Sequence, residues 1–251
     1  MTHCGWRLGL ALVREPTMFE RPHHQRIARV LAALNGSLLR HNHCLFGGGT
    51  AIALRYGEYR ESVDVDFLVS DVSSYRNLRQ LLTDPQGIVA ITRVDAEPLK
   101  QAREVRADQY GIRTVLLVDE QPIKFEIVLE GRIQLADPTP ADEICAIATL
   151  MPLDMATTKL LANSDRGLDD GVFNRDLIDL AMMNPPLALL RRAVAKAEQA
   201  YGKSIRQDLD KAINRMHDHH GWLERCIQAM AMTVPKAQLW QRIRALKRVQ
   251  A

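Results

Sequence analysis

Residues 46–69, FGGGTAIALRYGEYRESVDVDFLV, decide the fold of this chain. Three glycines precede a short apolar run of helical character, and the stretch ends in VDVDFLV, a pattern that predicts a buried strand. Because successive strand side chains point to opposite faces, Asp64 and Asp66 share one face of that strand. Two carboxylates side by side in an apolar setting are costly unless a cation lies between them. The stretch therefore predicts a cation site.

The donor atoms and the glycines indicate which chemistry this site serves. Oxygen-only ligands suit Mg²⁺ or Mn²⁺, and pairs of such cations commonly serve in-line phosphoryl transfer. Without a Cβ, the backbone of Gly48 and Gly49 can approach a phosphate closely, and the N–H groups of the helix start near Thr50 attract anions. No Gly-Lys-Ser/Thr follows the glycines, which excludes the loop of P-loop NTPases. We expect a metal-dependent nucleotidyltransferase that uses an NTP.

A third metal ligand is expected from a strand beside the two aspartates. Glu126 is the natural candidate, because it is an acidic residue inside the apolar strand pattern IKFEIV at residues 123–128. Asp64 and Asp66 would bind the metal on the triphosphate, and one of them with Glu126 would bind a second metal that activates the acceptor hydroxyl. The alternative is a strand residue that faces solvent or pairs with Lys124.

The order of these motifs resembles the polymerase-β-type nucleotidyltransferase superfamily. The resemblance is carried by Gly48-Gly49-Thr50 and by the spacing Arg60-x-Ser62-x-Asp64-x-Asp66. Within that superfamily, the chain is most similar to the AbiEii/AbiGii-type toxins of abortive-infection and type IV toxin–antitoxin systems. The narrower similarity rests on DMATTK at residues 154–159, on Arg166, and on RDLIDL at residues 175–180, and the resemblance covers roughly residues 22–185.

This resemblance implies a fold and a set of roles. The fold would be α+β, a polymerase-β-like lobe with a small mixed sheet followed by an α-helical lobe. Lys159 would reach the triphosphate, and Asp176 and Asp179 would position the nucleotide or the lysine. Arg60 and Ser62 would steady the glycine loop or touch phosphate. The alternatives are a solvated surface lysine, an acidic helix N-terminus and a simple salt bridge.

The resemblance also implies partners. The favoured acceptor is RNA, such as a tRNA 3′ end, and a cognate antitoxin is expected. A protein hydroxyl, a small molecule such as an antibiotic, and a non-catalytic nucleotide- or RNA-binding module of the same fold remain open alternatives.

Hydrophobic periodicity predicts strands mixed with helices in the first half of the chain and only helices after it. The expected strands are 45–46, 63–69, 88–94, 112–118 and 123–129, with a hairpin turn at residues 119–122. The expected helices are 21–41, 50–56, 72–82, 142–150, 153–163, 175–182, 186–201, 205–217, 221–230 and 237–249. The proline-rich segment 136–140 would separate a catalytic lobe, residues 22–136, from a helical lobe, residues 140–251.

Charge is distributed unevenly along the chain. Residues 186–251 hold 13 Lys and Arg against five Asp and Glu, whereas the first 185 residues hold 20 against 25. A basic helical region beside an acidic catalytic one suggests a surface for a phosphate-rich acceptor, although basic helix faces are also ordinary. The histidine groups at residues 23–24, 41–43 and 217–220 are expected at the surface.

The remaining composition indicates a globular cytoplasmic protein. Hydrophobic residues make up 47% and charged residues 25% of the 251 residues. The cysteines at positions 4, 44, 145 and 226 have no paired spacing, so we expect reduced thiols. Residues 6–13 are too short and too polar at their margins for a signal peptide, and no membrane segment is expected.

Overall fold

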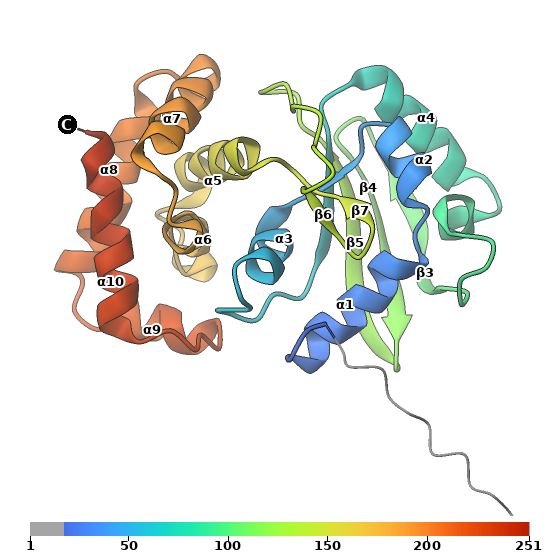
Figure 1. Cartoon of the computed structure of the whole chain (residues 1–251), viewed down its shortest axis with the longest axis horizontal. Coiled ribbons are helices and arrows are strands. Elements are labelled where there is room, and N and C mark those ends of the chain that lie inside the picture. Colours follow the sequence, from blue (N-terminus) through green and yellow to red (C-terminus); the bar gives the residue numbers. More distant parts are fainter. Residues whose placement is uncertain (1–17, 251) are drawn as a thin grey trace, which may run out of the picture.

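The computed structural model describes residues 18–250, arranged as a sheet-containing part and a helical part. In Figure 1, α1, α2 and α4 lie with the strands on the right, the helices α5–α10 lie on the left, and α3 lies between them. This arrangement confirms the expected α+β class, with a small mixed sheet followed in the chain by helices.

One five-stranded sheet carries the catalytic motifs. Its strand order is β1-β2-β5-β4-β3, and only the β2–β5 pairing is parallel. The strands are β1 Leu45–Phe46, β2 Val65–Val69, β3 Lys100–Ala107, β4 Gly111–Val118 and β5 Gln121–Leu129. The parallel register sets Asp66 directly beside Glu126. The two strands expected to hold the metal ligands are therefore neighbours.

The β4–β5 hairpin forms where the sequence predicts a turn. Asp119 and Glu120 both have positive φ, 51° and 58°. A two-residue type I′ turn requires positive φ at both positions, and its twist matches the right-handed twist of the flanking strands. Alternation along β5 buries Ile123, Phe125 and Ile127 on the core face. The opposite face is left for the charged residues of the strand.

The expected single helix over residues 21–41 is wrong, because the chain forms two. α1 spans Pro22–Ala33 and α2 spans Gly36–His41. Leu34 is extended, and the side chain of Asn35 caps α2 by accepting a hydrogen bond from the N–H of Leu38 at 3.0 Å. A residue that hydrogen-bonds its own following backbone in this way starts a new helix.

Three further expectations on secondary structure are corrected. The strand expected at 88–94 is the 3₁₀ helix Gly87–Ile91, which follows α4, Val72–Thr83. The helix expected at 142–150 is a small hairpin of β6, Glu143–Ile144, and β7, Ile147–Ala148, with Cys145 and Ala146 at positive φ. Strand β3, KQAREVRA, was not expected, because its charged residues leave no apolar alternation for an edge strand to show.

Helices α3 and α5–α10 pack around one continuous apolar core that also includes the sheet. Their bounds are α3 Gly48–Arg55, α5 Pro152–Arg166, α6 Arg175–Met183, α7 Leu187–Tyr201, α8 Ser204–Asp218, α9 Trp222–Ala229 and α10 Lys236–Ala245, and short 3₁₀ helices span Asp170–Val172 and Leu246–Val249. α5 packs against α6, α7 and α8, and α3 contacts both α5 and α6. The division into lobes 22–136 and 140–251 stays a prediction.

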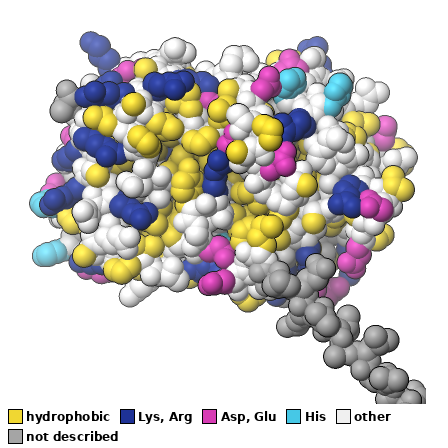
Figure 2. All heavy atoms as spheres, in the orientation of Figure 1, with side chains coloured by type: hydrophobic (Ala, Val, Ile, Leu, Met, Phe, Trp, Pro, Cys, Tyr) yellow, Lys and Arg dark blue, Asp and Glu magenta, His cyan; other side chains and the backbone are white. Residues whose placement is uncertain are grey.

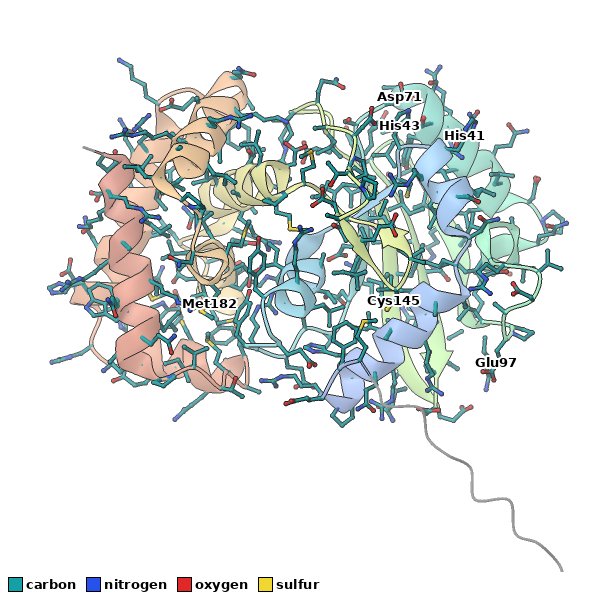
Figure 3. The ribbon with its side chains drawn as sticks, viewed as in Figure 1. His41, His43, Asp71, Glu97, Cys145 and Met182 are labelled. Carbon is teal, nitrogen blue, oxygen red and sulfur yellow. The ribbon has the colours of Figure 1, made fainter. Side chains whose placement is uncertain are left out.

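The surface is charged and varied. Lys and Arg side chains gather over the helical part in the view of Figure 2. His41 and His43 are exposed on the sheet-containing part, as expected (Figure 3). Among residues 18–250, no helix is long and apolar enough to cross a membrane. The expectations for Cys4 and for residues 6–13 lie outside the described residues.

Candidate active site

The predicted residues converge on one cleft between the sheet and the helical part. The cleft has a volume of about 530 Å³, which is in the range of small-molecule sites. Nine of the eleven predicted site residues line it, namely Gly48, Gly49, Arg60, Ser62, Asp64, Asp66, Glu126, Lys159 and Asp176. Thr50 and Asp179 are buried and bonded to members of this set.

The glycine loop, residues 47–50, packs directly on β2. The N–H of Gly47 donates to the carbonyl of Asp66 at 2.9 Å, and Gly48 has a φ of +67°. A Cβ on Gly48 would lie 2.6 Å from Asp66 Oδ2, so only glycine fits at this position. The backbone at the start of α3 is therefore exposed to the cleft beside the carboxylate of Asp66.

The same loop is held from behind by Arg60 and Ser62. A Cβ on Gly49 would lie 2.2 Å from Arg60 Nη2, which shows how closely the guanidinium packs on α3. The hydroxyl oxygens of Thr50 and Ser62 are 2.8 Å apart and share a hydrogen bond. Thr50 and Ser62 thus connect the glycine loop to the segment that leads into β2. No ligand is needed to account for either side chain.

Among the predicted site residues of this cleft, Asp64 and Asp66 have carboxylates without a partner within residues 18–250. Asp66 belongs to β2, Asp64 immediately precedes it, and both are half-buried. Within residues 18–250, neither carboxylate makes a described hydrogen bond or ion pair. Burial, followed by the negative charge of Asp64, raises the pKa of Asp66 to about 6. A divalent cation would relieve this repulsion, so the donor set fits Mg²⁺ or Mn²⁺.

Glu126 lies beside Asp66 but its carboxylate is already engaged. Arg113 Nε donates to Oε1 at 2.6 Å, and Lys124 Nζ is 2.5 Å from Oε2. Burial opposes ionisation, but the hydrogen bonds from Lys124 and Arg113 outweigh it and hold the pKa of Glu126 below its usual value. The pairing with Lys124 is the arrangement that the sequence left open as the alternative to metal binding.

The three carboxylates therefore share a cleft without forming a preassembled ligand set. In the described part of the chain, no three His, Cys, Asp or Glu side chains gather where they could hold one metal ion. Asp64 and Asp66 are free to do so, and Glu126 would have to leave Arg113 and Lys124 first. Its role as a metal ligand stays a prediction.

Opposite the carboxylates, Lys159 belongs to a buried ionic network. Its side chain is on α5 with 5% exposed, and Nζ lies 2.9 Å from Asp176 Oδ1 and 2.7 Å from Asp179 Oδ2. Asp176 also accepts two hydrogen bonds from Arg166, at 2.7 and 3.1 Å. Asp179 accepts from both Arg60 and Tyr59. Lys159 is thus not a solvated surface lysine.

The charges of this network determine the direction in which the pKa values of its side chains are shifted. Burial opposes the charged form of Asp176, but Lys159 and then Arg166 outweigh it and hold the pKa of Asp176 far below its usual value. Burial also opposes the charge of Lys159, and the two aspartates outweigh it and raise the pKa of Lys159. Three cations, Arg60, Lys159 and Arg166, face two aspartates, so the network carries one excess positive charge toward the cleft.

Several residues of the site were missed or given no role by sequence reasoning. The sequence marks Arg166 only as part of a motif, and no local pattern singles out Tyr59 or Arg113. Phe173 and Arg175 also line the cleft. Phe173 and Arg175 lie more than a hundred residues along the chain from Asp66, and no local pattern reports a contact over such a separation.

His24 corrects an expectation, since it is fully buried and not at the surface. Its Nε2 lies 3.1 Å from the backbone nitrogen of Ser62, and its Nδ1 lies 2.7 Å from Glu58 Oε1. The sequence signal was only its place in the apolar pattern of α1, three residues before Ile27.

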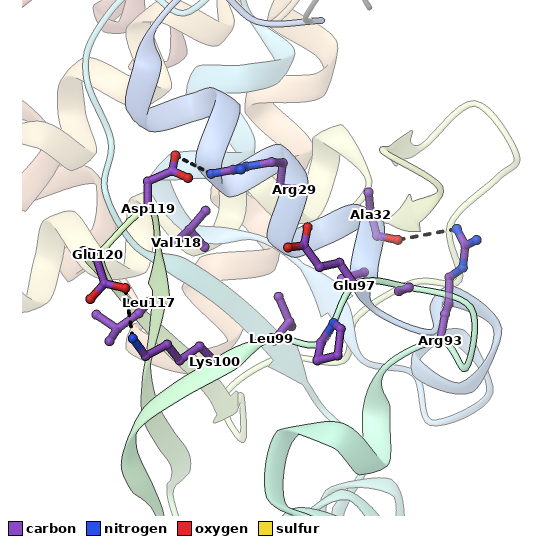
Figure 4. Close-up of a pocket in the computed structure, with 13 residues that line it drawn as sticks. Arg29, Ala32, Arg93, Glu97, Leu99, Lys100, Leu117, Val118, Asp119 and Glu120 are labelled. Carbon is purple, nitrogen blue, oxygen red and sulfur yellow. Dashed lines mark hydrogen bonds and ion pairs between the residues drawn. The ribbon is translucent and has the colours of Figure 1, made fainter. Parts of the chain in front are cut away.

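A second hollow lies on the sheet-containing part and holds none of the predicted residues. It has a volume of about 420 Å³ and runs between α1, residues 93–99 and the hairpin of β4 and β5 (Figure 4). Several of its charges are paired with one another, as in the contacts of Arg29 with Asp119 and of Lys100 with Glu120. Nothing in this lining points to a ligand.

The cleft thus combines a glycine-rich helix start, an aspartate pair at the start of β2, and the cations of Lys159 and Arg166 on the opposite wall. The model of the AbiEii family, described as "Nucleotidyl transferase AbiEii toxin, Type IV TA system", matches residues 29–245. The chain belongs to this family, which bears out the resemblance drawn from its motifs.

Comparison with solved structures gives two structures from Helicobacter pylori. One is described as a candidate nucleotidyltransferase, with 17% identity, a TM-score of 0.46, and coverage of 91% of this chain and 95% of that chain. The other, JHP933, has 17% identity, a TM-score of 0.47, and coverage of 91% and 92%. No curated protein matches the sequence.

Proposed function

We propose that this protein transfers a nucleoside monophosphate from an NTP to an acceptor hydroxyl, with Mg²⁺ or Mn²⁺ as cofactor. The observation that supports this most strongly is the contact between Gly48 and Asp66. It sets an exposed helix N-terminus beside an unpaired carboxylate whose pKa is raised to about 6. A phosphate and its metal need these two features next to each other.

Asp64 and Asp66 would hold the metal, and Glu126 is the candidate for a further ligand. When bound, the metal would neutralise phosphate charge and favour the ionised form of the acceptor hydroxyl. The start of α3 offers backbone N–H groups to the triphosphate. On the opposite wall, the excess positive charge of Lys159 and Arg166 would stabilise the negative charge of the departing pyrophosphate.

RNA, such as a tRNA 3′ end, is the acceptor that we favour, because the basic helical part offers cations to a polyanion. Not all of those cations are available. Arg206, Arg242 and Arg248 donate to the backbone carbonyls of Val249, Met182 and Pro185. Arg191, Arg192 and Arg244 make no hydrogen bond or ion pair within the described residues and are exposed. A phosphate backbone would contact these three first.

As a member of a type IV toxin family, the protein would act as a toxin restrained by a cognate antitoxin. Its toxicity would then follow from modification of an essential RNA. Loss of the transferase activity should abolish the toxicity together with the RNA labelling.

The experiment that tests this function is transfer of label from each of the four NTPs, α-labelled, in the presence of Mg²⁺. Total RNA, total protein and an aminoglycoside are supplied as separate acceptors. We expect labelled RNA from one or more NTPs and none from the Asp66→Ala variant. Label on protein or on the aminoglycoside would replace RNA as the acceptor. No label on any acceptor with any NTP would contradict transferase activity.

A further inference from the structure

His24 lies in the first turn of α1, with 0% of its surface exposed, and both ring nitrogens contact the segment that leads into the metal site. Nε2 is 3.1 Å from the backbone nitrogen of Ser62. A backbone N–H can only donate, so Nε2 must be the acceptor and carry no proton. Nδ1 then carries the ring proton and donates to Glu58. The two contacts define a neutral ring in one tautomer.

Glu58 is fixed at its own end of this chain of hydrogen bonds. Its carboxylate also accepts from the backbone N–H groups of Glu20 at 2.8 Å and Arg21 at 3.2 Å. The side chain of Arg21 in turn donates to the carbonyl of Glu58 at 3.0 Å. The position of Nδ1 is therefore set by an anchored carboxylate, and the direction of Nε2 follows from it.

The other end of the chain of hydrogen bonds is the segment of residues 61–64, which precedes β2 and lies before the paired register of β2 and β5. Its described contacts come from outside the sheet. Glu61 N–H donates to the carbonyl of Met230, and the side chain of His23 contacts the carbonyl of Val63. The Ser62 N–H donates to His24. Asp64 lies before the paired register of β2 and β5, which begins at Val65, so these contacts help to fix its position.

We propose that His24 is a positioning residue for nucleotidyl transfer, whose Nε2 holds Ser62 and thereby places Asp64 beside Asp66. Ser62 also shares its hydroxyl hydrogen bond with Thr50 of the glycine loop, so one imidazole sets both the carboxylate and the loop. This inference rests on the proposed function. It goes further, because it assigns a role to a residue that touches neither metal nor nucleotide.

Two substitutions separate the two hydrogen bonds of His24. In His24→Gln, the amide oxygen can take the place of Nε2 and accept from Ser62, while the donor to Glu58 is lost. In His24→Asn, the amide nitrogen can take the place of Nδ1 and donate to Glu58, but nothing reaches Ser62. Both variants remove the ring, so they lose a similar amount of packing. His24→Asn loses the contact with Ser62, whereas His24→Gln loses the contact with Glu58. The proposal therefore expects the larger effect from His24→Asn.

The first measurement is Mn²⁺ binding by calorimetry on the full chain without nucleotide. Loss of a group that orients a metal ligand typically costs ten- to a hundredfold in affinity. We expect His24→Asn to weaken Mn²⁺ binding by about tenfold or more, and His24→Gln to stay within about threefold of wild type. His41→Asn, at an exposed histidine, is the control. Equal loss in both His24 variants, wild-type affinity in His24→Asn, or no Mn²⁺ binding by wild type would overturn the proposal.

Transfer kinetics form the second arm. For His24→Asn we expect kcat to fall by about tenfold or more, with a smaller change in KM for the NTP. For His24→Gln we expect a kcat close to that of wild type. Wild type that binds Mn²⁺ but transfers nothing from any NTP would contradict the proposed function, and the calorimetry would still test His24.

A third measurement needs no variant, which matters if both substitutions prevent folding. Nitrogen-15 NMR of histidine-labelled wild type at pH 7 should show His24 with a proton on Nδ1 and an unprotonated Nε2. Amide exchange at Ser62 should be slow. A proton on Nε2, a doubly protonated ring or rapid exchange at Ser62 would overturn the proposal.

Discussion

Arg60 and Asp179 form a bidentate ion pair that joins the segment before β2 to helix α6. Nε and Nη2 of Arg60 donate to Oδ1 and Oδ2 of Asp179 at 2.7 and 3.0 Å, across 119 residues of chain. Both side chains are buried, and Tyr59 donates to the same carboxylate. Arg60 and Asp179 therefore build the wall behind the glycine loop, where each side chain is already engaged by the other.

Asp179→Asn should be strongly destabilising, because it leaves Arg60 and Lys159 buried with one anion fewer. Removing one partner of a buried ion pair costs about 3–5 kcal/mol of the free energy of unfolding. Urea unfolding measures this loss. Asp170→Asn, which breaks an exposed pair with Arg215, is the control and should cost at most about 1 kcal/mol. A loss as small as the control's would contradict a structural role for Asp179.

Lys159→Ala should lower both activity and stability. If Lys159 stabilises charge in the transition state, its loss should reduce kcat/KM by a factor equivalent to about 2–4 kcal/mol. The free energy of unfolding should also fall, because Asp176 and Asp179 lose a shared cation. Lys159→Arg should not restore activity, since a planar guanidinium does not fit the point between two carboxylate oxygens. Transfer kinetics and urea unfolding are measured on each variant, with exposed Lys211→Ala as the control. Unchanged kinetics would restrict Lys159 to a structural role.

Asp64→Ala and Asp66→Ala should abolish transfer and leave the fold intact. Each removes one of two unpaired, mutually repelling carboxylates, so thermal stability without metal should hold or rise. The measurements are NTP transfer with Mg²⁺ and thermal unfolding with EDTA. A variant with near-wild-type transfer would refute the assignment of these residues as metal ligands.

The part of the site that sequence could predict is the part built from neighbours in the chain. Asp64, Asp66, Gly48 and Gly49 were found because strand alternation and the lack of a Cβ have local consequences. The pairing of Glu126 with Arg113 could not be predicted in the same way. It depends on the register between β4 and β5, in which Arg113 stands directly opposite Glu126.

Errors in the fold have similar causes. The apolar residues at 142–150 suit a helix or a strand equally in so short a run, and the left-handed backbone of Cys145 and Ala146 decides for a hairpin. Lys159 could be placed only by resemblance, since a lysine on a helix is normally solvated. Its burial follows from Asp176 and Asp179, which lie one helical turn apart on α6 and face α5.

The pKa of Asp66 predicts a defined pH dependence of stability in the metal-free protein. Its value is about 6 in the folded state against 3.8 as the reference value. Between these two pH values the folded state keeps a proton that the unfolded state has lost, so the contribution of Asp66 to stability falls as pH rises. Asp66→Asn should therefore match wild type near pH 4 and exceed it above pH 6, by on the order of 1–3 kcal/mol. Urea unfolding in EDTA across this range tests it; a difference that is constant with pH would contradict the raised pKa.

Arg191, Arg192 and Arg244 are three of the exposed cations of the helical part that make no hydrogen bond or ion pair within residues 18–250. Reversing all three to glutamate should weaken RNA binding and leave NTP binding largely unchanged, because the cleft residues are untouched. For single-stranded RNA, each lost phosphate contact lowers the slope of log affinity against log salt by about 0.7, so the slope should flatten by about 2.

The matched control reverses three exposed cations of the sheet-containing part, Arg76, Arg79 and Arg103, with the same change in net charge. RNA affinity is measured for wild type and both variants between about 50 and 200 mM NaCl. Because net charge changes equally in the two variants, a loss of general electrostatic attraction alone would weaken RNA binding equally in both. A larger loss in the helical variant, with a flatter salt slope, locates the phosphate contacts on α7 and α10. Equal losses would mean that these cations are ordinary helix surface and that RNA has no preferred site there.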